Sequence, residues 1–151
     1  MKKIENKMVL VDDQTVQKEL LKLAVMELGI EVDLIYFTNA IMALNYLRTT
    51  TDKIFLIISD MNMRKMSGLD FKREIDADPS LSDKAVPFIF LSSEATKAQL
   101  KEAYDYRLQG YFIKPNDLKM LAKQLETIIN YWLLSVSPDS ENISDQPQII
   151  S

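Results

Sequence analysis

Apolar stretches that suit β-strands alternate with helical patterns five times along the chain. Three of these stretches, 7–11, 54–59 and 86–92, are continuous, as expected of strands in a parallel sheet covered on both faces. Two further strands are predicted at 31–37 and 110–113. Helices are predicted between and after the strands, at 16–28, 39–49, 68–76, 95–106 and 116–134. Five strand–helix repeats predict a doubly wound α/β domain with a five-stranded parallel sheet.

Single residues mark the ends of several of these elements. Gly29 suits the end of the first helix, and Asn39 suits the N-cap of the second. Pro79 is expected in the loop after the third helix, and Pro87 fits only the start or edge of a strand. Ser93 is expected to cap the fourth helix.

The pattern divides the chain into one domain at 1–134 and a tail at 135–151. A length of 151 residues with 47% hydrophobic residues is right for one domain with one sizeable core. No internal repeat and no second domain is visible. The tail is polar and contains two prolines, so it is predicted to be disordered.

The composition excludes several kinds of chemistry. The chain has no cysteine and no histidine, which removes disulfides, thiolate nucleophiles, Ser-His-Asp hydrolysis and histidine-ligated metals. Its three glycines cannot form a Walker loop or a G-x-G-x-x-G fingerprint. The net charge of -4 argues against general nucleic-acid binding. No apolar run approaches the roughly 20 residues of a membrane-spanning helix, and the start lacks a signal-peptide core, so a cytoplasmic protein is expected.

Charged and hydroxyl side chains stand where four of the five predicted strands end. The first strand runs into Asp12 and Asp13, the third into Asp60, the fourth into Ser92 and the fifth into Lys114. In open α/β sheets the functional residues lie outside the carboxyl ends of the strands. Three clustered carboxylates repel one another, and Mg²⁺ relieves that repulsion while keeping several of its waters. Together with the lysine and the hydroxyl, they are complementary to a phosphoryl group carried on one carboxylate.

Four motifs in this order make the chain resemble a known family. From about Lys7 to Leu134 the chain is similar to the receiver domain of two-component response regulators, through "VLVDD", "IISDMNMRKMSG", "IFLSSEA" and "YFIKP". The resemblance implies a flavodoxin-like (βα)5 fold with strand order 2-1-3-4-5. It also implies a single-domain regulator of the chemotaxis type or the phytochrome-associated type. Such a protein receives its phosphoryl group from a sensor histidine kinase or a histidine phosphotransfer protein, and is not a turnover enzyme.

The resemblance assigns the acceptor and the metal ligands by position. Asp60 is implied to be the phospho-acceptor and a Mg²⁺ ligand. Asp13 is implied to bind Mg²⁺ directly, and Asp12 to assist through water. The backbone carbonyl of Asn62 is implied to complete the protein ligands.

The same resemblance assigns residues that recognise the phosphoryl group and report its arrival. Ser92 is implied to donate a hydrogen bond to it, and Lys114 to pair with it. Tyr111 occupies the position of the family's aromatic switch, although it could equally be a half-buried strand aromatic. The Lys114–Pro115 bond is implied to be cis, a form that is accessible to proline.

The chain departs from the family pattern at a few positions. Arg64 stands where receivers usually carry proline, which loosens the loop and places a cation near the site. Ser92 and Ser93 replace the commoner threonine and alanine, and both keep the side chain small. Asn62 and Glu94 flank the acceptor as in chemotaxis-type receivers, a pairing that suggests comparatively fast hydrolysis of the phosphoryl group.

Two helical surfaces are candidates for partner binding. The first helix is expected to dock the phosphoryl donor through Gln14, Thr15 and Lys18. The last helix has a core stripe at i, i+3, i+4, i+7 spacing, formed by Leu118, Leu121, Leu125, Ile128, Ile129 and Trp132. Its opposite side carries Met120, Tyr131 and Leu134. These are either scattered exposed apolar residues or a docking or homodimer face beside the last strand.

Other functions are weighed against the phospho-acceptor. Asp12 and Asp13 alone would suggest helix-capping acids, but Asp60 and Lys114 argue for a site. A phosphorelay intermediate and a non-phosphorylated adaptor with the same fold remain alternatives. An aspartate-nucleophile phosphatase of the haloacid-dehalogenase type is disfavoured, because "VDDQT" has adjacent acids where that motif needs alternate ones.

Overall fold

A computed structural model of the protein describes residues 2–137. Five parallel strands form one sheet in the order β2-β1-β3-β4-β5. The strands are β1 (Lys2–Val11), β2 (Ile30–Phe37), β3 (Ile54–Ser59), β4 (Phe88–Ser92) and β5 (Gly110–Ile113). The predicted α/β class and the strand order are both confirmed.

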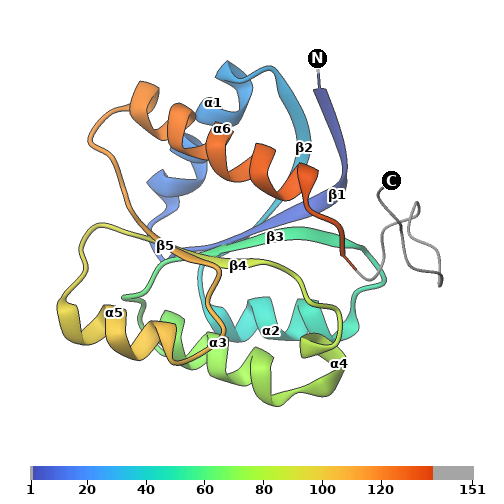
Figure 1. Cartoon of the computed structure of the whole chain (residues 1–151), viewed down its shortest axis with the longest axis vertical. Coiled ribbons are helices and arrows are strands. Elements are labelled where there is room, and N and C mark those ends of the chain that lie inside the picture. The colour runs from blue at the N-terminus through green and yellow to red at the C-terminus, as the bar shows by residue number, and fades with distance from the viewer. Residues whose placement is uncertain (1, 138–151) are drawn as a thin grey trace, which may run out of the picture.

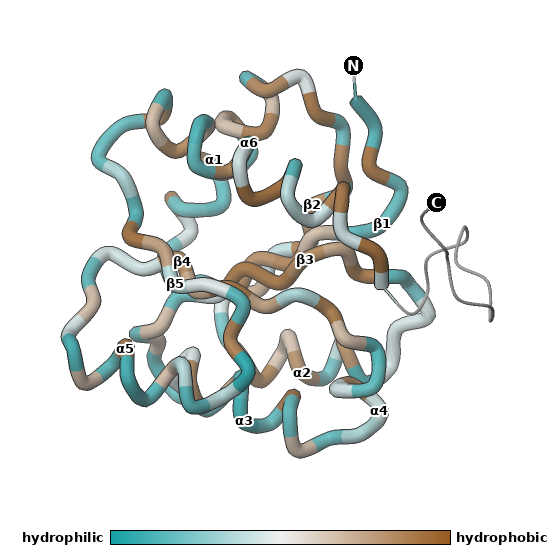
Figure 2. Tube along the Cα trace, viewed as in Figure 1, coloured by the Kyte–Doolittle hydropathy of each residue, from teal (hydrophilic) through white to brown (hydrophobic). Residues whose placement is uncertain are grey.

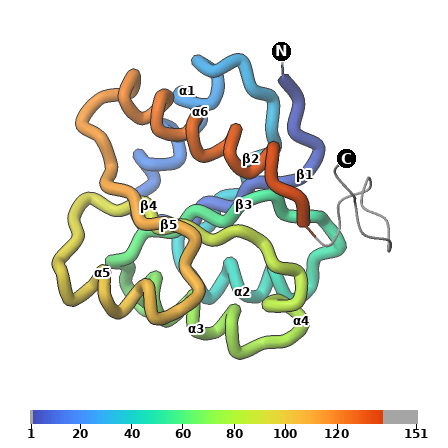
Figure 3. Tube along the Cα trace, viewed as in Figure 1, coloured from blue at the N-terminus to red at the C-terminus, as the bar shows by residue number. Residues whose placement is uncertain are grey.

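Helices cover both faces of the sheet. They are α1 (Thr15–Glu27), α2 (Ala40–Thr49), α3 (Gly68–Ala77), α4 (Pro79–Ser82), α5 (Lys97–Tyr104) and α6 (Leu118–Leu134). Figure 1 shows α1 and α6 on one face and α2, α3, α4 and α5 on the other. The chain crosses from the first face to the second after α1 and returns with α6, which can be followed in Figure 3.

Each face of the sheet buries its own apolar cluster. One cluster packs α1 and α6 onto the sheet around Met8, Leu56 and Leu125. The other packs α2 and α3 onto the opposite face around Val9, Phe71 and Phe90. In Figure 2 the most hydrophobic residues accordingly follow the central strands. This burial explains why β3 and β4 are continuous apolar runs.

Most predicted element ends are confirmed, and the caps explain them. Gly29 follows α1 with φ of 65°, a left-handed conformation that glycine adopts readily. The Asn39 side chain caps α2 by accepting a hydrogen bond from the Met42 N–H. Pro87 lies directly before β4, at the strand start that its missing N–H requires.

Three element predictions were wrong. Pro79 is not in a loop: it opens the short helix α4, where Asp78 is the N-cap and proline's fixed φ suits the first turn. Ser93 does not cap the next helix, because Thr96 is its N-cap and forms a capping box with Gln99. The first strand begins at Lys2 rather than residue 7, since its polar start pairs with β2 alone. The predicted disorder of 135–151 falls mainly on residues beyond 137, outside the described part.

Candidate functional site

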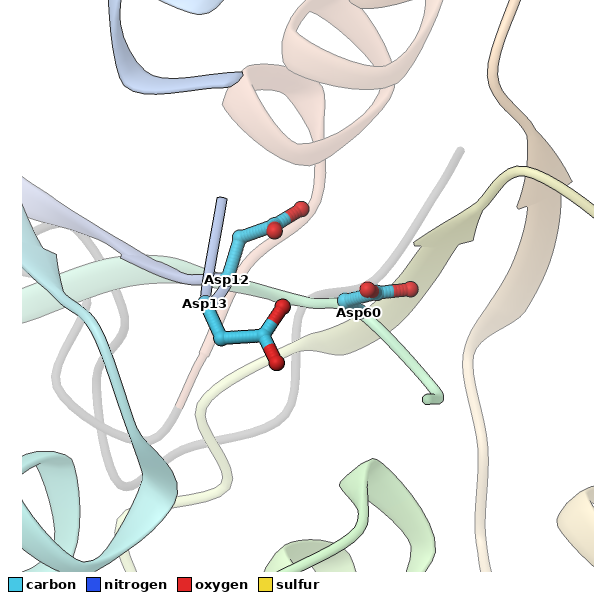
Figure 4. Close-up of side chains that lie close together, drawn as sticks. All are labelled: Asp12, Asp13 and Asp60. Atoms are coloured by element: carbon cyan, nitrogen blue, oxygen red, sulfur yellow. The ribbon is translucent and has the colours of Figure 1, made fainter. Parts of the chain in front are cut away.

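Three carboxylates meet at the carboxyl edge of the sheet. Asp12 and Asp13 directly follow β1, and Asp60 directly follows the neighbouring strand β3. One oxygen from each carboxylate lies within 4.8 Å of the others, and Figure 4 shows the three side chains close together. Asp12 and Asp60 are buried, while Asp13 is partly exposed. The sequence therefore located this cluster correctly.

Hydrogen bonds from backbone N–H groups fix the positions of Asp12 and Asp60 at the strand ends. The Asp60 N–H donates to the Val11 carbonyl at 2.9 Å, which ties the end of β3 to the end of β1. One Asp12 oxygen accepts from the Gln14 N–H at 2.9 Å. Gln14 itself is the N-cap of α1 and makes no side-chain cap, so neither acid is a helix cap. Asp60 is thus placed by the pairing of β3 with β1, and Asp12 by the turn that follows β1.

Lys114 brings a cation to the buried end of the cluster. Its Nζ lies 2.8 Å from Asp12 Oδ2, and its backbone N–H donates to the Ser92 carbonyl at 2.8 Å. Burial raises the pKa of the Asp12 carboxyl, although the Lys114 ammonium and the Gln14 N–H act in the opposite direction. The lysine predicted from the sequence therefore lies in the site, paired with Asp12.

The expected cis bond before Pro115 is wrong. No peptide bond in the described residues 2–137 is cis. The trans form of an X–Pro bond is favoured by about 0.5–1 kcal/mol where nothing opposes it. In this structure the Lys114 side chain reaches Asp12 with the trans bond in place.

The loop after Asp60 is folded tightly against the strand ends. The Met61 N–H donates to Asp60 Oδ1 at 2.8 Å, and the Gly68 N–H donates to the Met61 carbonyl at 2.8 Å. A Cβ on Gly68 would lie 2.1 Å from the Asp60 carbonyl oxygen, so only glycine fits this approach. The Arg64 N–H donates to Asp13 Oδ2 at 3.2 Å. The departure at Arg64 thus keeps a backbone donor for the acidic turn.

Two contacts at the site were not anticipated from the sequence. The Tyr36 hydroxyl, at the end of β2, donates to the Asp12 carbonyl at 2.6 Å. The Gln99 amide on α5 donates to the Asn62 side-chain oxygen at 3.3 Å. In each contact the two residues are far apart in sequence. The sequence indicated only that all four residues lie near the carboxyl edge of the sheet, and not that they contact one another.

Ser92 and Tyr111 lie on the last two strands, β4 and β5. Ser92 is buried at the end of β4, where it pairs with the last residue of β5. The Tyr111 hydroxyl donates to the Glu94 carbonyl at 3.0 Å, and its ring contacts Phe90 with centroids 5.6 Å apart. Burial raises the pKa of the Tyr111 hydroxyl, and the nearby Asp60 charge adds to this effect. Tyr111 therefore connects the loop after β4 to the sheet.

The residues predicted to bind partners lie on the surface. Gln14 and Thr15 are exposed at the start of α1, while Lys18 is partly buried with its ammonium over the Tyr36 ring. On α6 the side chains predicted to face away from the core are exposed, at 59% for Met120, 64% for Tyr131 and 87% for Leu134.

Among the helices of residues 2–137, none has the length and apolar character needed to cross a membrane.

The arrangement suits a divalent metal ion and a phosphoryl group. Carboxylate oxygens are the ligands that Mg²⁺ prefers, and a site that draws on few of them leaves room for its waters. The donor set of Asp12, Asp13 and Asp60 therefore fits a hard divalent cation. Asp60 offers a buried carboxylate beside it, with Ser92 at the end of β4 and Lys114 directly after β5.

Comparison with known proteins agrees with the fold. Residues 8–126 match the family model of the response regulator receiver domain. The match covers most of the chain, so the chain belongs to the response regulator receiver domain family. The resemblance drawn from the four sequence motifs is confirmed.

Individual relatives are similar over nearly their whole length. Chemotaxis protein CheY1 of Helicobacter pylori is 29% identical over 123 residues, which cover 82% of this chain and 96% of that protein. The phosphorylated cyanobacterial phytochrome response regulator RcpA superposes with a TM-score of 0.80 at 24% identity, covering 90% of this chain and 100% of the other. The Mn²⁺-bound response regulator Rcp1 gives a TM-score of 0.74 at 24% identity, with 87% and 96% covered.

Proposed function

We propose that the protein is a phosphorylation switch that accepts a phosphoryl group on Asp60. The observation that carries this proposal is the convergence of Asp12, Asp13 and Asp60, with Lys114 paired into the cluster at 2.8 Å. A buried group of like charges is unfavourable unless a cation or a reaction requires it. Membership of the receiver family supports the same role.

The chemistry is attack by one Asp60 oxygen on the phosphorus of a donor. The Met61 N–H holds Oδ1, which leaves the second carboxylate oxygen for the attack. A new O–P bond forms, and the bond from phosphorus to the donor's leaving group breaks, so that the leaving group departs with the electron pair. In a histidine kinase or a histidine phosphotransfer protein the leaving group is an imidazole nitrogen. These 151 residues contain no histidine, so the donor histidine lies outside them.

Mg²⁺ is part of this proposal. Asp13 and Asp60, with the Asn62 backbone carbonyl and a water-mediated contact from Asp12, would hold it. When bound, the ion neutralises negative charge that develops on the transferring phosphoryl oxygens. Lys114 would pair with the same oxygens, and the Ser92 hydroxyl would donate a hydrogen bond to one of them.

The signal would leave the site through the loop after β4. Ser92 and Tyr111 lie on adjacent strands, and Tyr111 is hydrogen-bonded to the carbonyl of Glu94 within that loop. A phosphoryl group that draws Ser92 toward Asp60 would shift this loop and change the surface around Tyr111. Such a shift is the kind of local charge event that a phosphorylation switch amplifies.

Phosphorylation by acetyl phosphate, read by intact mass with and without Mg²⁺, tests this proposal. One added phosphoryl group that requires Mg²⁺ and is absent in Asp60→Asn is expected. Asp105→Asn, which changes an exposed carboxylate at the end of α5, is the matched control and should be phosphorylated normally. No addition to the folded wild-type protein would favour the adaptor alternative. Turnover of p-nitrophenyl phosphate would instead favour a phosphatase.

The exposed side of α6 is proposed to bind a downstream partner or a second copy of the chain. Met120 and Tyr131 are both more than half exposed on this side. The double variant Met120→Lys with Tyr131→Glu should weaken self-association or partner binding of the phosphorylated protein, measured by analytical ultracentrifugation and pull-down. Equal association by the double variant and the wild type would contradict a role for this surface.

Passing the phosphoryl group onward is the alternative output. Incubating the phosphorylated protein with a histidine phosphotransfer protein distinguishes the two. Loss of the added mass from this chain and its gain by the acceptor would establish a phosphorelay intermediate. Retention of the group would leave phosphorylation-dependent binding as the output.

A further inference from the structure

A cavity of about 170 Å³ lies on the side of the sheet covered by α2, α3 and α4. Its walls come from the end of α2, the strands β3 and β4, the helices α3 and α4, and the segment before β5. Most of the wall is apolar and includes Leu47, Ile57, Ile75, Leu81 and Phe88. None of the carboxylates of the acidic cluster lines it. It is therefore separate from the site proposed for phosphorylation.

The cavity contains a buried lysine that the phosphorylation chemistry does not use. Lys72 on α3 is only 5% exposed, and its Nζ lies 5.4 Å from the centroid of the Phe88 ring. Its ammonium has three donors and makes one ion pair, at 2.7 Å to Asp76 Oδ1. An ammonium in apolar surroundings is unfavourable unless its donors are satisfied. The remaining donors can be satisfied by an acceptor in the cavity that Lys72 lines.

The charge on the cavity wall favours an anion. Lys72, Lys84 and Arg107 line it together with a single carboxylate, that of Asp76. Three positive groups and one negative group leave a balance of two positive charges. Lys84 and Arg107 are exposed, so water screens them, and Asp76 offsets the charge of the Lys72 ammonium. What the cavity offers an anion is therefore chiefly the two donors of the buried Lys72 ammonium that Asp76 does not use.

The size of the cavity limits what can enter. A cavity of about 150 Å³ lined by Leu, Ile and Phe accommodates benzene in another protein. A volume of about 170 Å³ therefore suits one aromatic ring or a branched aliphatic group of similar size, with a small charged substituent. The apolar wall matches the ring, and the ammonium of Lys72 matches a carboxylate.

We propose that this cavity binds a small monocarboxylate with one compact apolar group, such as an aromatic carboxylate. The carboxylate would pair with the Lys72 ammonium, and the apolar group would lie among Leu47, Leu81 and Phe88. The wall of the cavity also includes Ala85. The backbone of Ala85 has φ of 52°, a left-handed conformation that is rare for a residue with a Cβ. This inference does not depend on phosphorylation of Asp60.

Titration of the full chain with benzoate, followed by ¹H–¹⁵N NMR at constant ionic strength set with chloride, tests the proposal. Saturable shifts are expected for amides around Lys72, Ala85 and Phe88, with a midpoint on the order of 1 mM for so small a ligand. Benzamide, which keeps the ring and loses the charge, should bind at least about tenfold more weakly because charged hydrogen bonds are stronger.

Two variants test the two halves of the recognition. Lys72→Met keeps an apolar stem and removes the ammonium, so benzoate should bind at least about tenfold more weakly. Leu81→Phe keeps the ammonium and fills part of the cavity, so binding should also weaken. Lys119→Met changes an exposed lysine on α6 and is the matched control, with unchanged binding expected.

Several results would overturn the proposal. These are the absence of saturable shifts up to 20 times the expected midpoint, equal binding of benzamide and benzoate, and unchanged benzoate binding by Lys72→Met. The NMR spectrum of each variant shows directly whether it is folded. If Lys72→Met failed to fold, Leu81→Phe and the benzamide comparison would still decide the question.

Discussion

At the scale of single residues, Asp12 shows how a carboxylate is kept in an unfavourable place. Three groups hold it: the Lys114 ammonium and the Gln14 N–H on its side chain, and the Tyr36 hydroxyl on its carbonyl. The side chain is almost completely buried. Burial nevertheless outweighs these contacts and raises the pKa of the Asp12 carboxyl above its ordinary value.

This shift predicts how Asp12 contributes to stability as the pH changes. A carboxyl whose pKa is raised by folding binds its proton more tightly in the folded state. Its stabilising contribution is complete below the ordinary pKa of 3.8 and is lost as the pH rises through its folded value. The free energy of unfolding of the wild type, relative to Asp12→Asn, should therefore fall as the pH increases. Urea denaturation in EDTA from pH 3.5 to 8 measures this difference, and a rising difference would show that the Lys114 pair outweighs burial.

At the scale of elements, the start of α3 depends on one close approach. Gly68 opens this helix and lies directly against the backbone at the end of β3. The Ser67 side chain caps the helix by accepting from the Asp70 N–H at 3.1 Å. The loop after Asp60 is therefore closed by a close backbone contact that leaves no room for a side chain at residue 68.

Substituting Gly68 and Gly29 by alanine compares the stability lost through a steric clash with the stability lost through backbone strain alone. Gly68→Ala would place a Cβ 2.1 Å from the Asp60 carbonyl oxygen, so a loss of about 3 kcal/mol or more is expected. Gly29→Ala meets nothing within 4 Å and bears only the strain of its φ of 65°, about 1–2 kcal/mol. Urea denaturation of both variants gives the order. A smaller loss for Gly68→Ala than for Gly29→Ala would show that the loop can move away.

The element errors have identifiable physical causes. Pro79 suggested a break, but proline also fits the first turn of a helix when an acid such as Asp78 caps it. Ser93 and Thr96 are both good caps by type, and the capping box with Gln99 decides in favour of Thr96. The start of β1 was missed because residues 2–6 are polar apart from Ile4, and their pairing with β2 is a tertiary effect.

At the scale of the whole molecule, the sheet brings together residues that are distant in sequence. Those that directly follow a strand can be recognised from the sequence. Asp12, Asp60 and Lys114 could be predicted because parallel strands end at one edge. Tyr36 and Lys72 could not, because the polar tip of a partly or fully buried side chain has no periodic signal. The acidic cluster could therefore be predicted from the sequence, whereas the Tyr36 contact with Asp12 and the buried position of Lys72 could not.

Mg²⁺ is predicted to stabilise the whole fold. An ion that binds only the native state stabilises it by RT ln(1 + [L]/Kd), about 2.7 kcal/mol at 100 times Kd. Calorimetric melting should therefore show a rise in Tm with MgCl₂ that NaCl of equal ionic strength does not produce. Asp13→Asn should remove most of this rise, whereas the exposed Asp105→Asn should keep it. An equal rise in Asp13→Asn would place the ion elsewhere.

The ammonium of Lys114 is paired with Asp12 at the acidic cluster. Because Nζ lies 2.8 Å from Asp12 Oδ2, a phosphoryl group added to Asp60, as proposed, would compete with the Asp12 carboxylate for this one ammonium. A divalent ion that satisfies Asp12 makes the release of Lys114 easier. Coupling free energies are reciprocal, so a phosphoryl group that draws Lys114 away must raise the affinity for the ion by the same factor. On the proposed function, the ion pair between Lys114 and Asp12 would therefore make the metal ion and the phosphoryl group raise each other's affinity.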